Sequence, residues 1–345
     1  MQVRNKRSMI TVLFILMTGV FFTGCGFSYN YSFSTNKLKK ADAMEFNVEK
    51  AVVEPITKID IRTDTAEVEL IPSDNYYVEI NYLYWEEEPE YTLKNGVLKF
   101  DDRDALPDNY SINFNLDNSI KIYLPSKTDM SSLVIENSSG DVTVAGFQTD
   151  QLDITVSYGD FIMQEASASR AEITLSSGRS KISDSNIGSL DFTNSYGDAN
   201  FTNINTGEPI STDEASTDTI NITMSSGDID VNGLYCNSID ITNSYGDITC
   251  EEVTATEFEM DLSSGNLDVT NSDLMDINLN NSYGDIDLLL VGSEDAYNLD
   301  LHTSYGSITV GSDKYEEEFI RENNGVRVVN ADLSSGDFTL NFNDK

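Results

Sequence analysis

The sequence has few of the residues that carry chemistry in most enzymes and metal sites. Its 345 residues include one histidine, three cysteines, six prolines and one tryptophan. A lone histidine, His302, gives poor support for a Ser-His-Asp site, and zinc lacks ligands. Two cysteines in the body of the chain, Cys236 and Cys250, do not make a disulfide scaffold at this length, and no bond between them is expected. We therefore assign no catalytic residue and no resident cofactor.

Basic residues are also scarce. Lysine and arginine number 21 against 59 aspartates and glutamates, which gives a formal net charge of −38. A surface of this kind repels nucleic acid and anionic lipid, so nucleic acid is excluded as a partner. The acidity can be explained by solubility alone. Binding of a divalent cation or of a basic partner is the alternative interpretation.

The first 25 residues differ from the rest. Arg4, Lys6 and Arg7 precede an apolar run over residues 9–22, which is short for a membrane span. Thr23-Gly24-Cys25 follows and resembles the lipobox of bacterial lipoproteins, where the leader is cut before the cysteine and the cysteine is acylated. We expect a leader over 1–25 with Cys25 as the lipidation site; an uncleaved anchor is the alternative. Both predict an extracytoplasmic protein anchored to the cell membrane, and residues 26–50 are interpreted as a polar tether.

A Ser-x-Gly-Asp corner recurs along the chain, and "NSYGD" appears three times letter for letter. Aligned on the glycine, six of nine successive steps are 19 residues, and the longer ones fit insertions at a fixed turn. Such a period is the signature of stacked repeats. The corner glycines are Gly140, Gly159, Gly178, Gly197, Gly227, Gly246, Gly265, Gly284, Gly306 and Gly336.

Apolar residues stand seven and five before each corner glycine and four after it, and mostly also two after it, for example Ile239, Ile241, Ile248 and Cys250. Polar residues fill the positions between them. This alternation predicts a strand on each side of the corner. The fold class predicted is all-β, a single-domain parallel β-solenoid of about 10–11 coils with mostly 19 residues per repeat over 133–345. A 38-residue coil with two corners is the rival geometry.

The residue before the corner glycine alternates between serine and tyrosine through the first eight copies. Leucine or methionine three before the glycine accompanies serine, and asparagine accompanies tyrosine, in seven of ten copies. Because these two positions share strand parity, the exchange keeps interior volume constant. The pattern favours an inward, core position over a sugar-stacking surface for Tyr158, Tyr196, Tyr245, Tyr283 and Tyr305.

Aspartate usually follows the corner glycine. Carboxylates stacked about 4.8 Å apart repel one another, so calcium could bridge them. The interpretation that we favour is that each aspartate caps its own corner, because one aspartate per coil supplies too few ligands for a cage. The weak calcium candidates are Asp141, Asp160, Asp198, Asp228, Asp247 and Asp285. Arg170, Arg179 and Lys181 break this acidic pattern, and we interpret them as a simple charge break.

The N-terminal part, 51–132, fits a degenerate first coil followed by a cap. "IDIRTDTAEVEL" places Ala66 in the glycine column, and Lys94-Asn95-Gly96 is a hairpin signal within a largely irregular stretch over 75–124. At the other end the last coil stops at residue 345 without an evident cap, which predicts an open edge.

The run "IKIYLPSKTDMSSLVIENSSGDVTV" (Ile120–Val144) and the repeated corners after it resemble the toast-rack domain of bacterial envelope proteins, also called the putative-adhesin domain. The resemblance covers about residues 51–345. It implies a parallel β-solenoid exposed at the cell surface, often membrane-tethered, whose biochemical activity is not established.

The function expected is that of an exported, membrane-anchored surface protein, an adhesin or interaction module without catalysis, whose protein or polysaccharide ligand the sequence does not identify. An accessory of an envelope stress-sensing system is one alternative. A solenoid polysaccharide-active enzyme is another, and it requires a cleft with an isolated pair of carboxylates.

Overall fold

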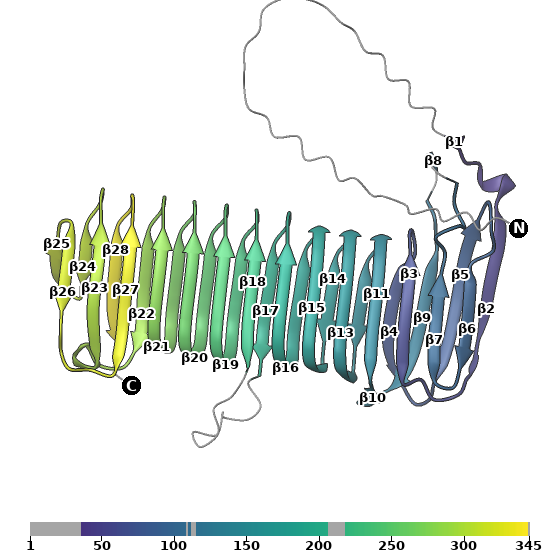
Figure 1. The fold of residues 1–345 in the computed structure, drawn as a ribbon, viewed down its shortest axis with the longest axis horizontal. Coiled ribbons are helices and arrows are strands. Elements are labelled where there is room, and N and C mark those ends of the chain that lie inside the picture. Colours follow the sequence, from purple (N-terminus) through teal and green to yellow (C-terminus); the bar gives the residue numbers. More distant parts are fainter. Residues whose placement is uncertain (1–35, 108–109, 112–114, 206–217, 344–345) are drawn as a thin grey trace, which may run out of the picture. The chain divides into compact units, whose positions relative to one another are not determined.

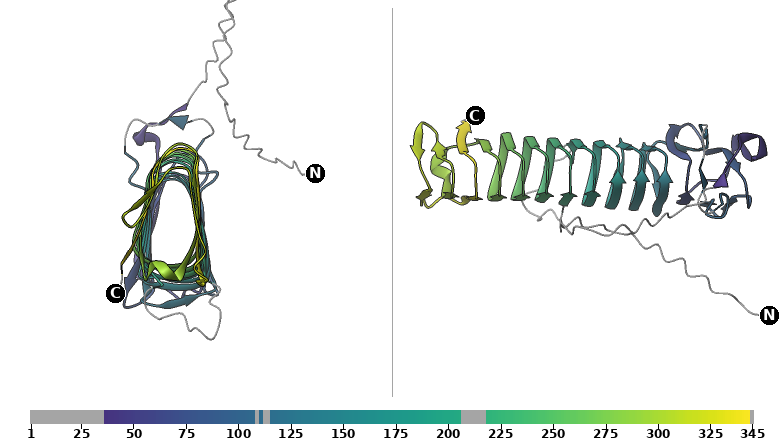
Figure 2. Two further views of the ribbon diagram at one scale, coloured as in Figure 1. Left: turned by 90° about the vertical axis from the view of Figure 1, so that its left-hand side faces the viewer. Right: turned by 90° about the horizontal axis from the view of Figure 1, so that it is seen from above.

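The computed structural model describes residues 36–107, 110–111, 115–205 and 218–343. Nearly all regular structure in these residues is β-strand, so the all-β prediction is confirmed. Strand, corner and strand form a flattened coil, and the coils stack one on the next (Figures 1 and 2).

The stack is parallel, and its register is set by the repeat. Leu152 of β13 pairs with Leu133 of β11, and Leu133 in turn pairs with Ile59 of β3. Parallel partners in the regular part are 19 residues apart, except that β16 with β18 and β17 with β19 are 30 apart, and the corner glycines stack in a single row throughout. The strands of this part are β10 (Thr128–Met130), β11 (Ser132–Ser139), β12 (Val142–Ala145), β13 (Phe147–Tyr158), β14 (Phe161–Gln164), β15 (Ser167–Ser177), β16 (Ser180–Asn194), β17 (Ala199–Ile204), β18 (Thr219–Met224), β19 (Ile229–Asn243), β20 (Ile248–Leu262), β21 (Leu267–Asn281) and β22 (Ile286–Val291).

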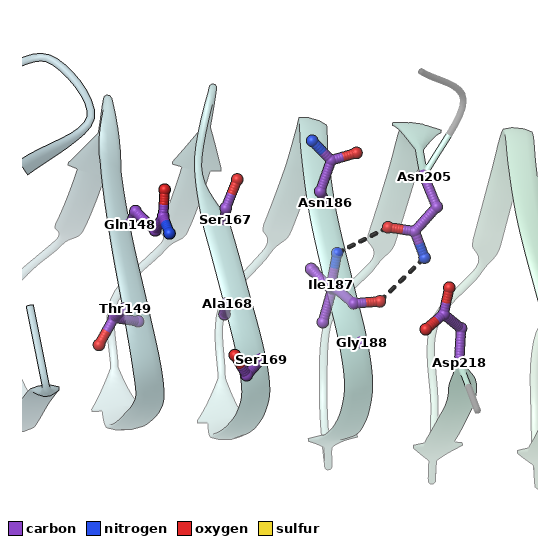
Figure 3. A pocket seen from close by; sticks show the side chains of 10 residues that line it. All are labelled: Gln148, Thr149, Ser167, Ala168, Ser169, Asn186, Ile187, Gly188, Asn205 and Asp218. Carbon is purple, nitrogen blue, oxygen red and sulfur yellow. Dashed lines mark hydrogen bonds between the residues drawn. The ribbon is translucent and has the colours of Figure 1, made fainter. Parts of the chain in front are cut away.

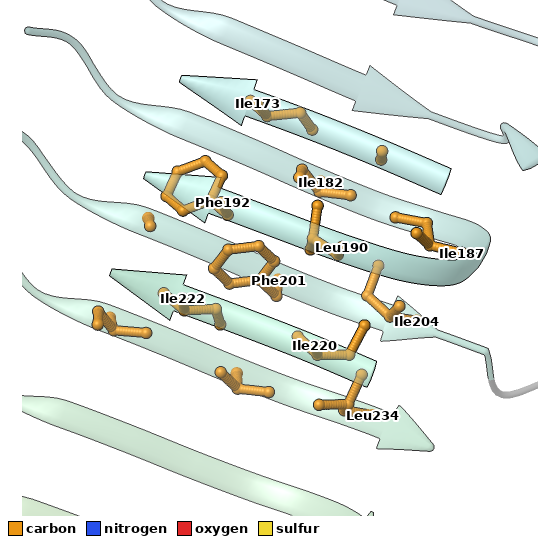
Figure 4. Packing of buried hydrophobic residues seen from close by; sticks show 14 of the residues in the cluster. Ile173, Ile182, Ile187, Leu190, Phe192, Phe201, Ile204, Ile220, Ile222 and Leu234 are labelled. Carbon is orange, nitrogen blue, oxygen red and sulfur yellow. The ribbon is translucent and has the colours of Figure 1, made fainter. Parts of the chain in front are cut away.

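The four apolar columns predicted from the sequence line the inside of the coils. Ile239, Ile241, Ile248 and Cys250 are all buried, as are their counterparts along the stack. Figure 4 shows this packing around Phe192 and Phe201, whose rings meet edge to face with centroids 5.2 Å apart. The core is therefore one continuous apolar interior enclosed by the two strand faces of every coil.

A second corner lies six residues after each of the first seven corner glycines. The long strands bend there at residues with positive φ, among them Glu165 (φ 51°), Asp184 (φ 51°), Asn203 (φ 55°), Glu252 (φ 54°) and Asn271 (φ 50°). Asparagine, aspartate and glycine tolerate this left-handed region best, and glycine takes the same place at Gly146 and Gly233. This column of residue types is a second turn signal in the sequence, and the period alone predicted only the first corner.

At the N-terminal end the coils do not follow chain order. The coil of β3 (Lys58–Thr63) and β4 (Glu67–Ser73) lies between the first regular coil and an outer coil made by later residues (Figure 1). A Cβ placed on Gly140 would lie 2.4 Å from the carbonyl oxygen of Ala66, so Ala66 occupies the glycine column as predicted. The outer coil consists of β7 (Val97–Asp101) and β9 (Ser119–Pro125).

Antiparallel strands cover this outer coil. They are β2 (Met44–Val52), β5 (Tyr77–Tyr84) and β6 (Glu90–Lys94); β1 (Asn36–Lys37), η1 (Lys40–Asp42) and β8 (Tyr110–Ser111) are short. The stretch expected to be irregular is thus mostly strand, and β2 begins inside the segment interpreted as a tether. The predicted hairpin is confirmed, because Lys94 pairs with Val97 around Asn95 and Gly96, both at positive φ.

The C-terminal end has the same arrangement in reverse. After η2 (Glu294–Ala296), β23 (Tyr297–Thr303) and β24 (Ile308–Val310) form the outermost coil, and β25 (Asp313–Tyr315) and β26 (Glu318–Arg321) pair with it antiparallel. The chain then returns, and β27 (Arg327–Leu333) and β28 (Phe338–Asn343) lie between that coil and the one of β21 and β22. The prediction of an open edge after the last coil was wrong, because the last coil in sequence is internal and the outermost one is covered.

Candidate functional site

The corner requires glycine because neighbouring coils approach very closely there. Gly246 has φ +132°, and a Cβ at this position would lie 2.1 Å from the carbonyl oxygen of Gly227 in the preceding coil. The clash is with backbone, which cannot move aside without breaking the strand pairing. The predicted role of the ten corner glycines as structural residues is consistent with this contact.

A buried asparagine holds two corners at once. The side chain of Asn194 donates from Nδ2 to the carbonyl oxygens of Gly178 (2.9 Å) and Gly197 (3.1 Å), and its Oδ1 accepts the N–H of Tyr196 (3.2 Å). Asn281 makes the same three bonds to Gly265, Gly284 and Tyr283. One amide therefore satisfies the corner carbonyls of two adjacent coils, and the intervening coil can place leucine or methionine in that column.

The tyrosines before the corner glycines point outward. We call Tyr158, Tyr196, Tyr245, Tyr283 and Tyr305 the tyrosine row; their exposed fractions are 68, 65, 64, 66 and 79%. The prediction that these rings fill the core was wrong. At Tyr196 and Tyr283 the asparagine two residues earlier accepts the tyrosine N–H and turns the backbone, so strand parity ends at the asparagine and the ring lies outside.

Along the stack, the residue before the corner glycine alternates strictly between serine and tyrosine, whereas the residue three before the glycine does not always alternate with it. In chain order the alternation of serine and tyrosine fails at Tyr305, which follows Tyr283 directly. In space it does not fail, because the corner of Gly336, preceded by Ser335, lies between those of Gly284 and Gly306. In order along the stack, the ten residues are Ser139, Tyr158, Ser177, Tyr196, Ser226, Tyr245, Ser264, Tyr283, Ser335 and Tyr305.

The inner column, by contrast, breaks its pattern at Asn137, Val156 and Thr303, and the outer residue is unaffected there. Interior packing therefore explains the asparagines and does not explain the tyrosines. This independence marks the tyrosine row as a candidate functional surface.

The six aspartates lie along the same edge, beside the tyrosine row. Their Oδ1 atoms accept backbone N–H groups of the next coil: Asp141 from Asp160 (2.8 Å), and Asp228 from Asp247 (2.9 Å). Each aspartate thus caps the corner of its neighbour, whereas the sequence analysis favoured a cap on its own corner. In the part of the chain that the structure describes, no three histidine, cysteine, aspartate or glutamate side chains gather closely enough to hold a metal ion.

Arg179, next to the corner glycine Gly178, and Arg170, near the start of β15, both pair with acids. Arg179 Nη2 lies 2.8 Å from Asp160 Oδ2, and Arg170 lies 3.4 Å from Asp191. Partial burial raises the pKa of Asp160, but the hydrogen bonds from Arg179 outweigh burial and hold that pKa below its usual value. Arg179 cannot accept a hydrogen bond, so it interrupts the ladder of aspartate caps and replaces it locally with an ion pair.

A groove of about 560 Å³ follows the second corner of four neighbouring coils (Figure 3). Small residues, among them Ala168 and Gly188, make room for it, and Asn205 closes one end through two hydrogen bonds to the backbone of Ile187 (2.6 and 2.9 Å). Its lining is uncharged apart from Asp218 and mixes polar side chains with the apolar side chains of Ala168 and Ile187. The groove offers hydrogen bonds, but these lining residues form no nucleophile–base pair.

The N-terminal cap holds a buried carboxylate, Asp102, whose pKa is shifted far from its ordinary value. Asp102 is 1% exposed, and it accepts hydrogen bonds from Thr63 Oγ1 (2.6 Å) and the N–H of Asp64 (2.9 Å). Burial raises its pKa to about 6. A raised pKa is typical of a general acid, but this side chain faces the core and holds the corner of the coil that carries Ala66 in place of glycine.

Two carboxylates near Asp102, those of Asp101 and Asp60, are paired with cations. Asp101 forms a bidentate pair with Arg103, and Asp60 lies 3.7 Å from Lys99. Burial raises the pKa of Asp101, but its hydrogen bonds to Arg103 outweigh burial and hold that pKa below its usual value. This arrangement does not resemble the open carboxylate pair of a glycosidase.

The remaining chemical candidates are structural. His302 lies outward on β23, with Nε2 2.8 Å from Asp300. Cys236 and Cys250 are both free and buried; Cys250 lies in the core as expected, and burial raises the pKa of each thiol to about 12. Cys25 and the leader lie outside the described residues. Among the residues that are described, no helix is both long enough and apolar enough to cross a bilayer.

A family model described as Toastrack DUF4097 matches residues 56–211 and 209–341. No curated protein matches the chain. Crystal structures that it resembles include a protein named a putative adhesin from Bacteroides fragilis (11% identity, 88% of this chain and 98% of that chain, TM-score 0.39) and one named a putative lipid binding protein from Parabacteroides distasonis (12%, 90% and 100%, 0.35). A protein named a putative cell adhesion protein from Clostridium sporogenes also aligns (11%, 88% and 100%, 0.21). Because the family model spans most of the sequence, this chain belongs to the Toastrack DUF4097 family.

Proposed function

We propose that the chain is an exported, membrane-anchored surface protein that acts as an adhesin-type interaction module and not as an enzyme. Its scaffold is a parallel β-solenoid of 19-residue coils. The leader before Cys25 supports export and anchoring, with Cys25 carrying the lipid. The tyrosine row is the contact surface, and it is the observation that carries the proposal.

Single exposed aromatic residues are common on protein surfaces and need no explanation. Five tyrosines at one position of alternate coils are different, because every ring remains about two-thirds exposed or more. A tyrosine ring provides a large rigid contact area at a low cost in side-chain entropy, which is why tyrosine is enriched in binding surfaces. The corner needs only a small polar residue there, as the five serine coils show.

The acidic charge supports a contact role without catalysis. Carboxylates near the row have one oxygen engaged in caps, and Asp60 and Asp101 of the N-terminal cap are paired with lysine and arginine. The surface around the tyrosines is thus fixed in geometry by backbone bonds. A rigid, repeating edge suits an extended ligand that contacts several coils at once.

The test combines location with binding. Mass spectrometry of the mature chain should find a diacylglyceryl-modified Cys25 as the first residue, and protease added to intact cells should degrade the protein. The full chain, purified in detergent, should then co-sediment with at least one of four insoluble materials: bacterial cell walls, chitin, cellulose or fibrous collagen. The variant Y196S/Y245S/Y283S should co-sediment with none of them. Equal sedimentation of both proteins with all four would refute the tyrosine row as the contact surface.

A further inference from the structure

We infer that the tyrosine row binds an extended glycan that repeats every two sugars, and that this glycan is neutral or cationic. The inference rests on the proposed function and adds a ligand class to it. It is derived from the spacing, the exposure and the electrostatics of the row.

The spacing follows from the stacking of coils. Adjacent parallel strands are about 4.8 Å apart, so tyrosines in every second coil repeat at roughly 9.6 Å. An extended chain of β-1,4-linked pyranoses turns by half a revolution at each sugar, so it presents the same ring face at every second sugar. That two-sugar repeat is close to twice the strand spacing. Successive tyrosines therefore meet equivalent faces of one straight glycan.

The exposure of the rings shows why serine alternates with tyrosine. Aromatic rings in adjacent coils would lie at stacking distance and cover each other's faces. With serine between them, four of the five tyrosines keep almost the same exposed fraction, 64–68%, so each ring face stays open. The negatively polarised face of an aromatic ring attracts the positively polarised C–H bonds on the apolar face of a pyranose. One ring can thus hold one sugar of each repeat.

The charges beside the row select among glycans. Asp198, Asp247 and Asp285 follow the glycines next to Tyr196, Tyr245 and Tyr283, and each uses Oδ1 to cap the neighbouring coil. Oδ2 is left to accept a hydrogen bond from a hydroxyl, amide or ammonium group of a sugar. The same carboxylates, in a chain of net charge −38, repel uronate, sulfate and phosphate groups.

Affinity should grow with the length of the glycan. A disaccharide contacts one tyrosine, whereas a hexasaccharide spans three in succession. Once one sugar is bound, the binding of the next sugars is intramolecular, so three weak contacts together give a much higher affinity than one contact.

The probes are β-1,4-linked N-acetylglucosamine oligomers of two, four and six sugars and their partly deacetylated forms, titrated calorimetrically into the full chain in detergent. We expect the dissociation constant to fall at least about tenfold from the disaccharide to the hexasaccharide. α-1,4-linked glucose hexamers, which coil, and carboxymethyl cellulose, which is anionic, should bind at least about tenfold more weakly than the β-1,4 hexamer.

Variants of the row separate ring stacking from other causes. Y196S/Y245S/Y283S should lose hexamer binding, while the phenylalanine triple variant should keep it within about threefold, because the ring face is retained. The control variant Y235S makes the same chemical change within β19 and outside the tyrosine row, and it should bind the hexamer as the natural chain does. Circular dichroism and melting temperature show that each variant folds, and serine is already the residue of alternate coils.

The inference is overturned if the hexamer binds no better than the dimer, if the α-linked control binds equally well, or if the serine variant still binds. Row-dependent sedimentation with collagen but not with chitin or cellulose would also overturn it, and the proposed function would stand. Loss of row-dependent binding to every material would remove both.

Discussion

Tyr283 and Tyr305 are successive members of one exposed row, with a single coil between their two coils, although that coil is formed by residues that come later in the chain. β27 and β28 supply the intervening coil, and Ser335 is its residue at the row position. The serine–tyrosine alternation is therefore a property of the folded stack and not of the linear sequence. The return of the chain at the C-terminal end therefore keeps the spacing of the tyrosines regular along the proposed contact surface.

Replacing Gly246 with alanine tests the close approach of the corners. Positive φ alone costs ~1–3 kcal/mol for alanine, and a Cβ 2.1 Å from the Gly227 carbonyl oxygen adds overpacking that cannot relax. Gly292 is the matched control, because its φ of +119° is similar and nothing lies within 4 Å of the position that an alanine methyl would take. Urea unfolding should show a larger loss for G246A than for G292A by at least about 2 kcal/mol. Equal losses would mean that the corner contact is unimportant.

Replacing Asn194 with leucine tests the bridge between two corners. Leucine occupies this column in alternate coils, so it fits, but the carbonyls of Gly178 and Gly197 lose their donor. We expect a loss of ~2–4 kcal/mol in the free energy of unfolding, because buried carbonyls without partners are costly. M224L, a volume-conserving change in the same column of the next coil, should cost less than about 1.5 kcal/mol. If N194L is as stable as M224L, the asparagine is dispensable.

The buried carboxyl of Asp102 predicts a pH dependence. Its pKa is about 6 in the folded chain, against an ordinary value of 3.8, because burial disfavours the charged form. The folded state therefore binds the proton more tightly, and this contribution to stability is complete below about pH 4 and is lost as the pH rises through 6.

D102N removes that titration. The unfolding free energy of D102N relative to the natural chain should increase between pH 4 and pH 7, by up to ~3 kcal/mol. Urea unfolding at four pH values measures this difference, and the many other acids of the chain cancel in the comparison. A difference that does not vary with pH would show that Asp102 has an ordinary pKa.

The aspartates predict a weak response to calcium. Each cap uses Oδ1 on a backbone N–H, so one oxygen per coil remains, and a calcium ion takes six to eight ligands. Melting of the full chain in millimolar calcium and in chelator, at matched ionic strength, should give nearly equal temperatures. A large shift specific to calcium would restore the aspartates as a ligand row, since a ligand of the folded state raises the melting temperature by mass action.

The segment that carries β25 and β26 predicts a role in keeping the protein monomeric. It pairs antiparallel with β24 and β23, and Tyr315 stacks on Phe319 with ring centroids 4.2 Å apart. Replacing residues 312–322 with a Gly/Ser linker of equal length exposes the outermost coil as a free edge. Light scattering should then show association that grows with concentration, because unpaired strand edges pair with other chains. A variant that stays monomeric would show that this edge needs no cover.

The core columns could be predicted because strand alternation and a fixed period are both local properties of sequence. Ile239, Ile241 and Ile248 are buried where the alternation places them. The ring of Tyr196 could not be placed by the same rule, because the Asn194 cap ends the strand before the tyrosine. The displaced order of the end coils has no counterpart in the periodicity. Its one signal was the repeated tyrosine at Tyr305, where a serine was due.

The bridge made by Asn194 and by Asn281 has a consequence for how such chains change length over evolution. Because one amide joins two corners, and one tyrosine alternates with one serine, the unit that can be duplicated without disturbance is a pair of coils. Loss or gain of a single coil would bring two tyrosines, or two serines, side by side and leave a pair of glycine carbonyls without their asparagine. Duplication or deletion of two 19-residue coils at a time preserves both patterns. The unit that evolution can add or remove is therefore two coils long, although the structural repeat is one coil.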